Sequence, residues 1–522
     1  MKRIHQLSKT LQALIAWDAF KLRLFFEGIL VGFVVGLIIG SFVWVLHQAS
    51  VIRQFIYQSY ITPALFAGNG LPFIGWIVFA LLLSLIIYRL CIHETMAMGG
   101  GIPQVKGELL GIFHMKWLSV LYVKFIGVVL GILGGLSIGR EAPSVQIGAA
   151  AAKGISRLFG RFPLEEKYLI TSGSSAGLAA AFSAPLAGTV FALEEMNQSF
   201  SSAVLLPSMA AAVTATMVTR YIFGESALFI FPTMPDSTIA LIIPIILVGA
   251  ICGPFGVLYN YGLTHVGLFY KKISLHGVWP RLFFALVIGA FVCLWLPEIT
   301  EGGDDLVNSI VANRPGLLFL ILLFIGKYIF TILSTGSGIP GGFLVPMFAL
   351  GGLLGAIQSS IFISVGILDP IFSNNIVTAA MAAFVTASMR SPITSVLLIL
   401  ELTGDFSHLT TLVLASAIAY VTSALVGGKP IYGELLSKAL SKHPKTTKKA
   451  RTLIEVPVGP GSYLENKQIK EIAWPTCSTV VEIKNGEHTL IPTADVRLST
   501  GMILYVLTLP SNSPQLLKMG QS

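Results

Sequence analysis

Long apolar runs recur along most of this chain, from about residue 25 to about residue 427. Runs of this length can cross a bilayer, because a spanning helix needs about 20 apolar residues. Shorter apolar stretches between them are typical of half-helices or re-entrant segments. The pattern predicts an all-α polytopic membrane protein, with its clearest spans at 28–46, 74–90, 120–136, 239–258, 282–296, 317–333 and 412–426.

Three glycine-rich turns interrupt this apolar part where a spanning helix should continue, at 98–103, 139–143 and 336–342. In lipid, open backbone survives only where protein buries it or where it lines a watery cavity. Each turn is followed by a segment that can resume a helix, so free N–H groups and the positive end of a helix dipole face the gap. We therefore expect these breaks to mark the functional site, with an anion as its ligand.

The charges indicate how the chain lies in the membrane. Of 522 residues, 54% are hydrophobic and 11% charged, and the net charge is +9. Lys and Arg gather before the first run, at 153–167, at 271–281 and after the last run. Because basic loops stay on the cytoplasmic side, we expect both termini to be cytoplasmic, and we see no cleavable signal. Membrane lipid, rather than nucleic acid, is the expected partner of this basic surface.

The apolar part repeats its own pattern. Motifs of a first half, at about residues 25–222, recur in the same order in a second half, at about 238–427. Broken helices at matching positions of two repeats point to a transport site at the repeat interface. Chance similarity between Gly- and Ala-rich helices is the alternative. The matching residues are Lys124 with Lys327, Pro143 with Pro346, Gly148 with Gly351, Pro185 with Pro392 and Glu194 with Glu401.

The composition changes after the membrane part, which we place at 1–440. A Lys-rich linker at 441–452 is followed by short apolar stretches at 454–458, 479–484 and 502–507, with Gly-containing turns between them. This pattern predicts a small soluble α+β domain at 453–510. We expect the tail at 511–522 to be disordered.

The sequence shows no pattern typical of an enzyme. It has no Ser/His/Asp grouping and no phosphate-cradling loop, and its cysteines lack metal-ligand or redox spacing. We therefore expect neither a cofactor nor a metal, and we interpret the cysteines as apolar fillers. These cysteines are Cys91, Cys252, Cys293 and Cys477.

Four motifs, over about residues 20–440, resemble those of the CLC family of chloride channels and chloride/proton antiporters. They are GGGIP at 99–103, GREAP at 139–143, GFLVP at 342–346 and GKPIY at 428–432. The resemblance implies a CLC-type inverted repeat of broken and tilted helices. It also implies a homodimer with one pathway per subunit, multi-pass in the bacterial inner membrane.

The resemblance further implies which residues bind the anion. In the family, the first and third motifs bring helix N-termini to a central anion site, which the amides of Phe343 and Leu344 and the hydroxyl of Tyr432 would then line. The second motif would supply amides to an outer site. The implied anion-binding residues are Gly99, Gly100, Gly101, Arg140, Glu141, Ala142, Phe343, Leu344 and Tyr432.

Glu141 also has a physical interpretation of its own. A carboxylate at an amide-lined helix start is itself an anion, so it can occupy the site when ionised and leave it when protonated. Proton and anion binding would then compete for one place, which makes Glu141 an external gate and proton carrier. The alternative is a structural salt bridge with Arg140 or Lys124.

Glu194 and Glu195 end an otherwise apolar segment. Glu195 falls where antiporters of the family resemble one another in placing an internal proton-transfer glutamate, and channels of the family usually lack a carboxylate there. Its presence favours exchange over passive conduction. The alternative is a polar helix end that faces cytoplasmic water. We expect Glu194 to be structural or part of a water path.

Three positions depart from the family pattern. Gly100 stands where chloride-type members usually carry serine, so one hydroxyl donor to the anion is missing and the anion preference is open. Ala142 replaces the usual glycine of the second motif and adds a methyl group beside the gate. Leu344 replaces the usual phenylalanine of the third motif but keeps its amide.

The soluble domain resembles, more loosely, the RCK_C (TrkA-C) subdomain of regulators of potassium conductance. In that group the domain dimerises, and in several bacteria it binds cyclic di-AMP. The resemblance implies cyclic di-AMP or another nucleotide as a partner, in a sensing or dimer-stabilising role. A domain that only adds stability is the alternative.

Taken together, the residues and the resemblances predict an anion/proton antiporter that exchanges protons for chloride or a related anion such as nitrate. A passive voltage- or ligand-gated chloride channel on the same fold is the second hypothesis, which Gly100 keeps open. A membrane sensor or scaffold that no longer transports is the third, and the presence of Glu141, Glu195 and Tyr432 argues against it.

Overall fold

The chain folds into two compact units. The computed structural model describes residues 2–198, 200–224, 228–232, 234–236, 238–273, 275–442, 452–485, 488–508 and 512–520. The larger unit, here the membrane unit, comprises Met1–Lys106 with Met115–Leu435, and the smaller, here the C-terminal unit, comprises Gly107–His114 with Leu436–Ser522.

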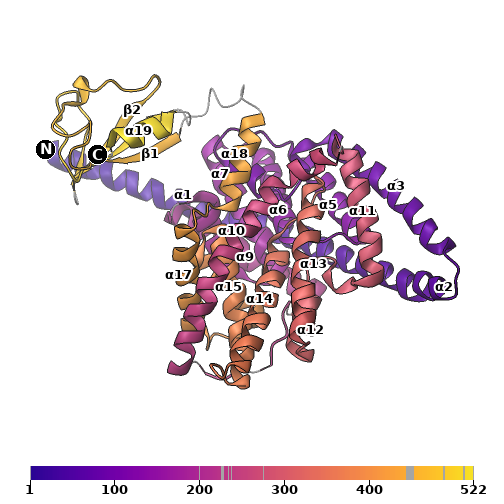
Figure 1. The fold of residues 1–522 in the computed structure, drawn as a ribbon. Coiled ribbons are helices and arrows are strands. Elements are labelled where there is room, and N and C mark those ends of the chain that lie inside the picture. Colours follow the sequence, from indigo (N-terminus) through magenta and orange to yellow (C-terminus); the bar gives the residue numbers. More distant parts are fainter. Residues whose placement is uncertain are drawn as a thin grey trace. The chain divides into compact units, whose positions relative to one another are not determined.

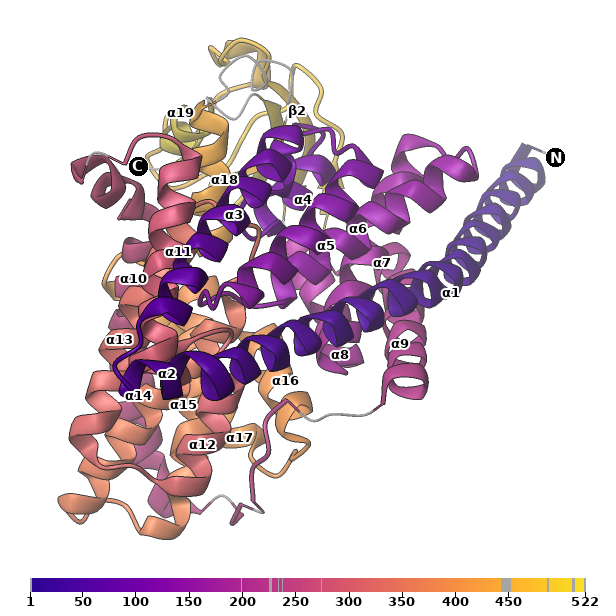
Figure 2. The same ribbon diagram turned by 90° about the vertical axis from the view of Figure 1, so that its right-hand side faces the viewer.

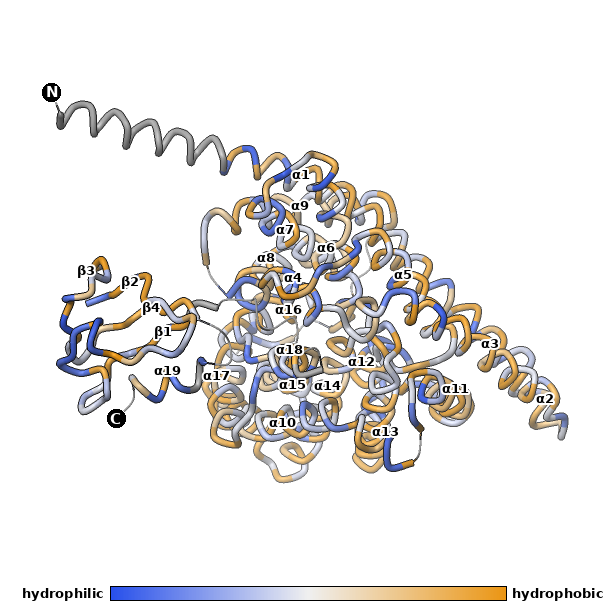
Figure 3. Tube along the Cα trace, turned by 90° about the horizontal axis from the view of Figure 1, so that it is seen from above, coloured by the Kyte–Doolittle hydropathy of each residue, from blue (hydrophilic) through white to orange (hydrophobic). Residues whose placement is uncertain are grey.

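The membrane unit is a bundle of helices of very different lengths (Figure 1). Among the described residues, eight helical stretches are long and apolar enough to cross a membrane. Hydrophobic residues line much of α3, α10, α11 and α13, as expected of helices that face lipid (Figure 3). The helices of the first half are α1 (Lys2–Ile56), α2 (Thr62–Phe66), α3 (Leu71–His93), α4 (Ile102–Leu109), α5 (Trp117–Leu133), α6 (Glu141–Leu158), α7 (Pro163–Phe182), α8 (Pro185–Phe191) and α9 (Ser202–Phe223). Those that follow are α10 (Ile242–Lys272), α11 (Val278–Trp295), α12 (Asp304–Asn313), α13 (Leu317–Gly336), α14 (Leu344–Ser364), α15 (Ser373–Met389), α16 (Pro392–Thr403), α17 (Leu409–Leu425) and α18 (Ile431–Lys442).

Each of the seven predicted spans coincides with a helix, but the sequence pattern missed three long ones. These are α9, α14 and α15, and the most apolar stretches of α14 and α15 are 72% and 83% buried within the unit. Their faces carry many Gly, Ala, Ser and Thr residues, which let helices approach closely but lower the hydropathy. Because protein rather than lipid surrounds them, they need less hydrophobicity than the peripheral helices.

Equivalent turns of the two halves adopt the same backbone conformation. Ser183, which ends α7, has φ 54° and ψ 33°, and Arg390, which ends α15, has φ 64° and ψ 29°. The next residues agree as closely, since Ala184 has φ −121° and ψ 76° and Ser391 has φ −120° and ψ 78°. A left-handed residue followed by this conformation is uncommon. Its recurrence supports the predicted repeat against chance similarity.

The two halves also exchange helix caps. The carboxylate of Glu194 accepts hydrogen bonds from the N–H groups of Ile393 (3.2 Å) and Thr394 (2.7 Å), at the start of α16. The carboxylate of Glu401 accepts from Leu186 (3.0 Å) and Ala187 (2.7 Å), at the start of α8. Helices α8 and α16 lie side by side (Figure 2). Each glutamate therefore satisfies the orphan amides of the other half's helix, which is the structural role expected of Glu194.

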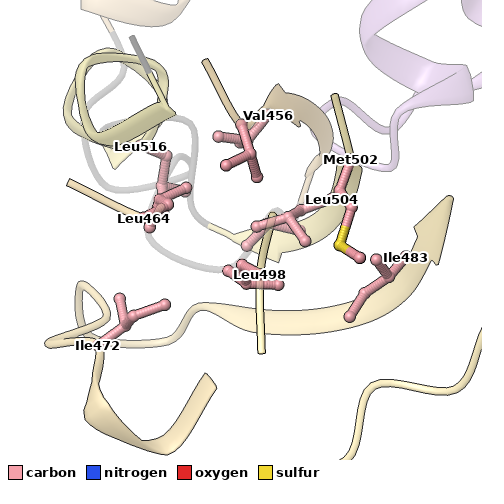
Figure 4. Close-up of a cluster of buried hydrophobic side chains, with 10 residues drawn as sticks. Val456, Leu464, Ile472, Ile483, Leu498, Met502, Leu504 and Leu516 are labelled. Atoms are coloured by element: carbon pink, nitrogen blue, oxygen red, sulfur yellow. The ribbon is translucent and has the colours of Figure 1, made fainter. Parts of the chain in front are cut away.

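The C-terminal unit contains a four-stranded antiparallel sheet with strand order β1-β4-β2-β3. One face buries a hydrophobic cluster that includes Val456, Leu464, Ile483, Leu504 and Leu516 (Figure 4). Its strands are β1 (Thr452–Pro457), β2 (Thr479–Asn485), β3 (His488–Leu490) and β4 (Ile503–Thr508). The predicted strands are thus present, and the connection between β1 and β2 includes a 3-10 turn at Ile469–Glu471.

The prediction of a disordered tail at 511–522 is wrong for most of its residues. Ser513–Gly520 form the helix α19, whose Leu516 is fully buried in the cluster under the sheet. The carbonyl of Gly520 also accepts a hydrogen bond of 2.8 Å from the N–H of Gly459. A single buried leucine on a short amphipathic helix is a weak sequence signal, so polarity alone misled the prediction. The predicted linker lies outside the described residues from 443 to 451.

Candidate functional site

The three predicted breaks come together and pair through their backbones. Gly139 and Gly342 form an antiparallel bridge, in which each N–H donates to the other carbonyl, at 2.8 and 2.9 Å. The N–H of Gly99 donates to the carbonyl of Ile339 (3.2 Å), and the N–H of Gly341 donates to that of Gly99 (3.0 Å). Paired in this way, the open backbone is hydrogen-bonded inside the protein, as a low-dielectric environment requires.

Two fully buried lysines, at matching places of the two halves, donate to backbone carbonyls, and one of them does so at the first break. The Nζ of Lys124, on α5, donates to the carbonyls of Ala97 (2.8 Å) and Gly99 (2.6 Å). The Nζ of Lys327, on α13, donates to three successive carbonyls of the second half, the last being that of Glu301 at 2.9 Å. The matched lysines therefore do the same work in both repeats. Lys124 is engaged with carbonyls and not with Glu141, so the structure does not show the alternative salt bridge.

Glu141 is the first residue of α6, and its carboxylate points at the start of α14. Its Oε1 accepts a hydrogen bond of 2.5 Å from the N–H of Leu344, while Oε2 has no protein partner among the described residues. The side chain is fully buried and lies against Gly139 and Gly342, where a side chain on either glycine would collide with it. Among the described residues it makes no ion pair. The carboxylate thus lies at a helix N-terminus, where a negative group is stabilised.

The first break presents two glycines with different constraints. Gly101 has φ +114°, and a Cβ there would stand 2.5 Å from the Oε1 of Gln146, so only glycine fits. A Cβ at Gly100 would instead meet the Cβ of Ala142 at 3.5 Å and the ring of Phe343 at 3.8 Å, which are ordinary contacts. Gly100 therefore faces the other two motifs, and packing does not require a glycine at this position.

Tyr432 brings the fourth motif to the same place. Its ring stacks on that of Phe343, with centroids 5.4 Å apart and planes at 28°. The side chain is fully buried, and its hydroxyl has no protein partner among the described residues. The carbonyl of Phe343 accepts a hydrogen bond of 3.3 Å from the hydroxyl of Tyr259. A buried hydroxyl without a protein acceptor is costly unless a ligand or water satisfies it.

Glu195 lies on a π-helical turn, Ala192–Asn197, and is only 3% exposed. Its Oε1 accepts from the Nζ of Lys106 at 2.6 Å, and its Oε2 accepts from the hydroxyl of Ser391 at 2.7 Å. The alternative of a helix end in cytoplasmic water therefore does not hold for Glu195. Turns of this type are rare and often found at functional sites. Here the turn lets neighbouring glutamates face different partners, since Glu194 caps α16.

Arg140 is the sequence-predicted residue that stands apart from this constellation. It is partly exposed and lines a cavity of about 190 Å³ together with His47, Gly139, Asp304 and Asp305. This cavity reaches the backbone beside Glu141, and Arg140 shares its lining with three carboxylates, those of Glu301, Asp304 and Asp305.

Sequence reasoning missed two residues that contact Glu195. Lys106 is a lysine in a short helix directly after the first break, and it was not singled out. Ser391 directly precedes the matched Pro392 and was not singled out either, although its counterpart before Pro185 is Ala184, which cannot donate from a side chain. The sequence signal that could have identified Ser391 is this difference between two equivalent positions, a serine in one half and an alanine in the other.

Two family models match the chain. Residues 79–424 match the model described as voltage gated chloride channel, and residues 453–519 match the TrkA-C domain. The chain is 34% identical over 428 residues to the H(+)/Cl(-) exchange transporter ClcA of Vibrio cholerae serotype O1 (strain M66-2), with 80% of this chain and 89% of that protein covered. It is 32% identical over 384 residues to the H(+)/Cl(-) exchange transporter ClcA of Yersinia pestis bv. Antiqua (strain Angola), with 71% and 78% covered.

Solved structures show the same architecture. A slow cyanobacterial Cl-/H+ antiporter superposes with a TM-score of 0.75 at 27% identity, over 81% of this chain and 99% of that one. A CLC-type fluoride/proton antiporter superposes with a TM-score of 0.66 at 23% identity, over 79% of this chain and 97% of that one, and shares the fold.

Proposed function

The chain belongs to the voltage gated chloride channel (CLC) family, and we propose that it exchanges an anion of the chloride class for protons across a membrane. The observation that carries this proposal is the carboxylate of Glu141 on the N–H of Leu344. When this carboxylate binds a proton, it loses its charge and leaves an amide-lined position, which an anion can then take. One place then serves both ions in alternation, which is the physical basis of exchange.

We assign the central anion position to the start of α14 and the hydroxyl of Tyr432. The N–H of Leu344, at this helix N-terminus, now holds the carboxylate of Glu141, and the buried hydroxyl of Tyr432, whose ring stacks on that of Phe343, has no protein partner among the described residues. Gly100 approaches the same space without adding a donor. The donors are therefore mostly backbone amides, which bind halides and nitrate alike, so the anion preference is broad.

Glu195 favours exchange over passive conduction. It is buried on the π-helical turn, and the relatives named above are exchange transporters and an antiporter. We assign Glu195 as the internal proton-transfer group and Glu141 as the external gate.

We further propose a homodimer in the bacterial inner membrane with both termini in the cytoplasm, as the basic loops suggest. The TrkA-C domain would sense a small ligand or stabilise the dimer. Titrating the full-length protein with cyclic di-AMP tests the sensing role. Saturable binding below millimolar concentration supports it, and its absence across that range removes cyclic di-AMP as the ligand.

The exchange proposal is tested by flux from liposomes that carry a pH probe. With a chloride gradient and no proton gradient, the wild type is expected to drive protons uphill. Glu195→Gln is expected to keep the anion flux and lose the proton movement, and Glu141→Gln to lose coupled exchange. Glu298→Gln, at an exposed site, is the matched control and is expected to behave as wild type. Anion flux without proton movement in the wild type would instead establish the channel.

A further inference from the structure

Two donors converge on the carboxylate of Glu195 from separate helices. Lys106 approaches from α4 with its ammonium 2.6 Å from Oε1, and Ser391 approaches from the cap of α16 with its hydroxyl 2.7 Å from Oε2. The side chains of Lys106 and Glu195 are only 9% and 4% exposed. A buried ammonium and a buried hydroxyl that point at one negative group are the components of an anion site.

The arrangement has the same logic as the gate at Glu141. There the carboxylate of Glu141 accepts a hydrogen bond from the amide of Leu344. Here the carboxylate of Glu195 accepts hydrogen bonds from an ammonium and a hydroxyl. Among the described residues, the second arrangement has no counterpart in the other half. The position equivalent to Ser391 is Ala184, with nearly identical backbone angles, so the hydroxyl is an addition that the turn itself does not need.

We propose that Lys106 and Ser391 form an inner binding site for a monovalent anion such as chloride, which the carboxylate of Glu195 occupies when ionised and vacates when protonated. This inference rests on the proposed function, because it gives the internal proton-transfer group an anion partner. Proton loading at Glu195 and anion entry at the inner end of the path are then one linked event.

The linkage follows from the cost of an unpaired buried charge. A proton that binds Oε1 of Glu195 removes the negative partner of the Lys106 ammonium, and a buried cation without a partner is expensive. An anion that takes the place of the carboxylate removes this cost. By reciprocity, the anion raises the proton affinity of Glu195 by the same factor that the proton raises the anion affinity.

The charged and titratable groups around Glu195 come from several elements. Lys106 comes from α4, Glu194 from the same π-helical turn, and Tyr432 from α18, while α16 presents Ser391. Glu194 is held on the amides of α16, and Tyr432 carries no charge at neutral pH. Lys106 is therefore the one cation in this set that can receive an anion.

Chloride binding to the purified full-length protein, measured by calorimetry between pH 5 and pH 8, tests the proposal. Glu195→Gln mimics the protonated carboxyl, so we expect it to bind chloride about fivefold or more tightly than wild type at pH 8, with a weaker dependence on pH. Lys106→Met is expected to remove the inner site and its share of the pH dependence. Ser391→Ala is expected to weaken this site about tenfold or less and to fold normally, because Ala184 already occupies the equivalent turn.

Lys272→Met is the matched control, since Lys272 is exposed at the end of α10 and loses the same charge. It is expected to bind chloride as wild type does. The proposal is overturned if Glu195→Gln binds chloride no more tightly than wild type at pH 8. It is also overturned if Lys106→Met keeps the wild-type affinity and pH dependence. Coupled flux in liposomes is a separate readout. A wild type that moves anions without moving protons refutes exchange, and the binding data still decide whether the inner site exists.

Discussion

Replacing Gly100 by serine should restore a missing donor to the central anion. The Cβ of the new side chain would stand 3.5 Å from the Cβ of Ala142 and 3.8 Å from the Phe343 ring, both ordinary van der Waals distances. The backbone at Gly100 lies outside the left-handed region, so serine adopts it without strain. The substitution therefore adds a hydroxyl and displaces nothing.

The size of the effect follows from one added hydrogen bond to a charged ligand. Such a bond is worth about 1.5–3 kcal/mol. Since about 1.4 kcal/mol corresponds to a tenfold change in a binding constant, Gly100→Ser should bind chloride about 10- to 100-fold more tightly. A rotating hydroxyl favours a small spherical anion, so the gain for nitrate should be smaller and the ratio of the two affinities should shift toward chloride.

The assay is calorimetric titration of the purified protein with chloride and with nitrate, followed by flux with each anion. Gly101→Ser is the matched control, because it makes the same chemical change one residue later. There serine would take φ +114° and press on Gln146, so this variant should lose stability and transport. The reasoning is refuted if Gly100→Ser leaves the chloride affinity within twofold of wild type, or if Gly101→Ser folds and transports normally.

Three further outcomes follow. Tyr432→Phe should keep the thermal stability, because the hydroxyl has no protein partner, and should weaken chloride binding about tenfold by calorimetry; a loss of stability with unchanged binding would contradict the ligand role. Glu194→Ala should lower the free energy of unfolding by about 1–2 kcal/mol because it uncaps α16, and thermal unfolding should show a midpoint a few degrees lower. Glu401→Ala should lower this free energy by a similar amount if the two caps are equivalent. Leu516→Ala should destabilise the C-terminal unit by about 2–5 kcal/mol, read as faster proteolysis of that unit in the full chain, whereas Ile491→Ala, at an 81% exposed side chain, should not change it; equal rates would refute the docking of α19.

The breaks and the repeat could be predicted because each leaves a local mark. Gly-rich turns in apolar surroundings are visible in a few residues, and Lys124 and Lys327 stand at matching places in two similar segments. The positions of Glu141 and Tyr432 came with the same motifs.

The features that could not be predicted from the sequence depend on contacts between residues that are remote in sequence. Lys106 meets Glu195 only because α4 and the π-helical turn pack together, and nothing in either segment indicates the other. The pairing of Gly139 with Gly342 likewise follows from how the halves meet. The buried helices α14 and α15 escaped notice because small residues serve packing against protein, which a hydropathy criterion for lipid does not measure.

The exchanged caps bear on how the protein is made. When the ribosome has delivered the first half, α8 already has its proline and its apolar length, but the carboxylate that binds its first amides belongs to Glu401, near the end of the second half. The first half inserted alone would hold those amides without this acceptor. Final closure of the early helices therefore waits for the late ones, and a nascent chain truncated before Glu401 would be a natural substrate for membrane quality control.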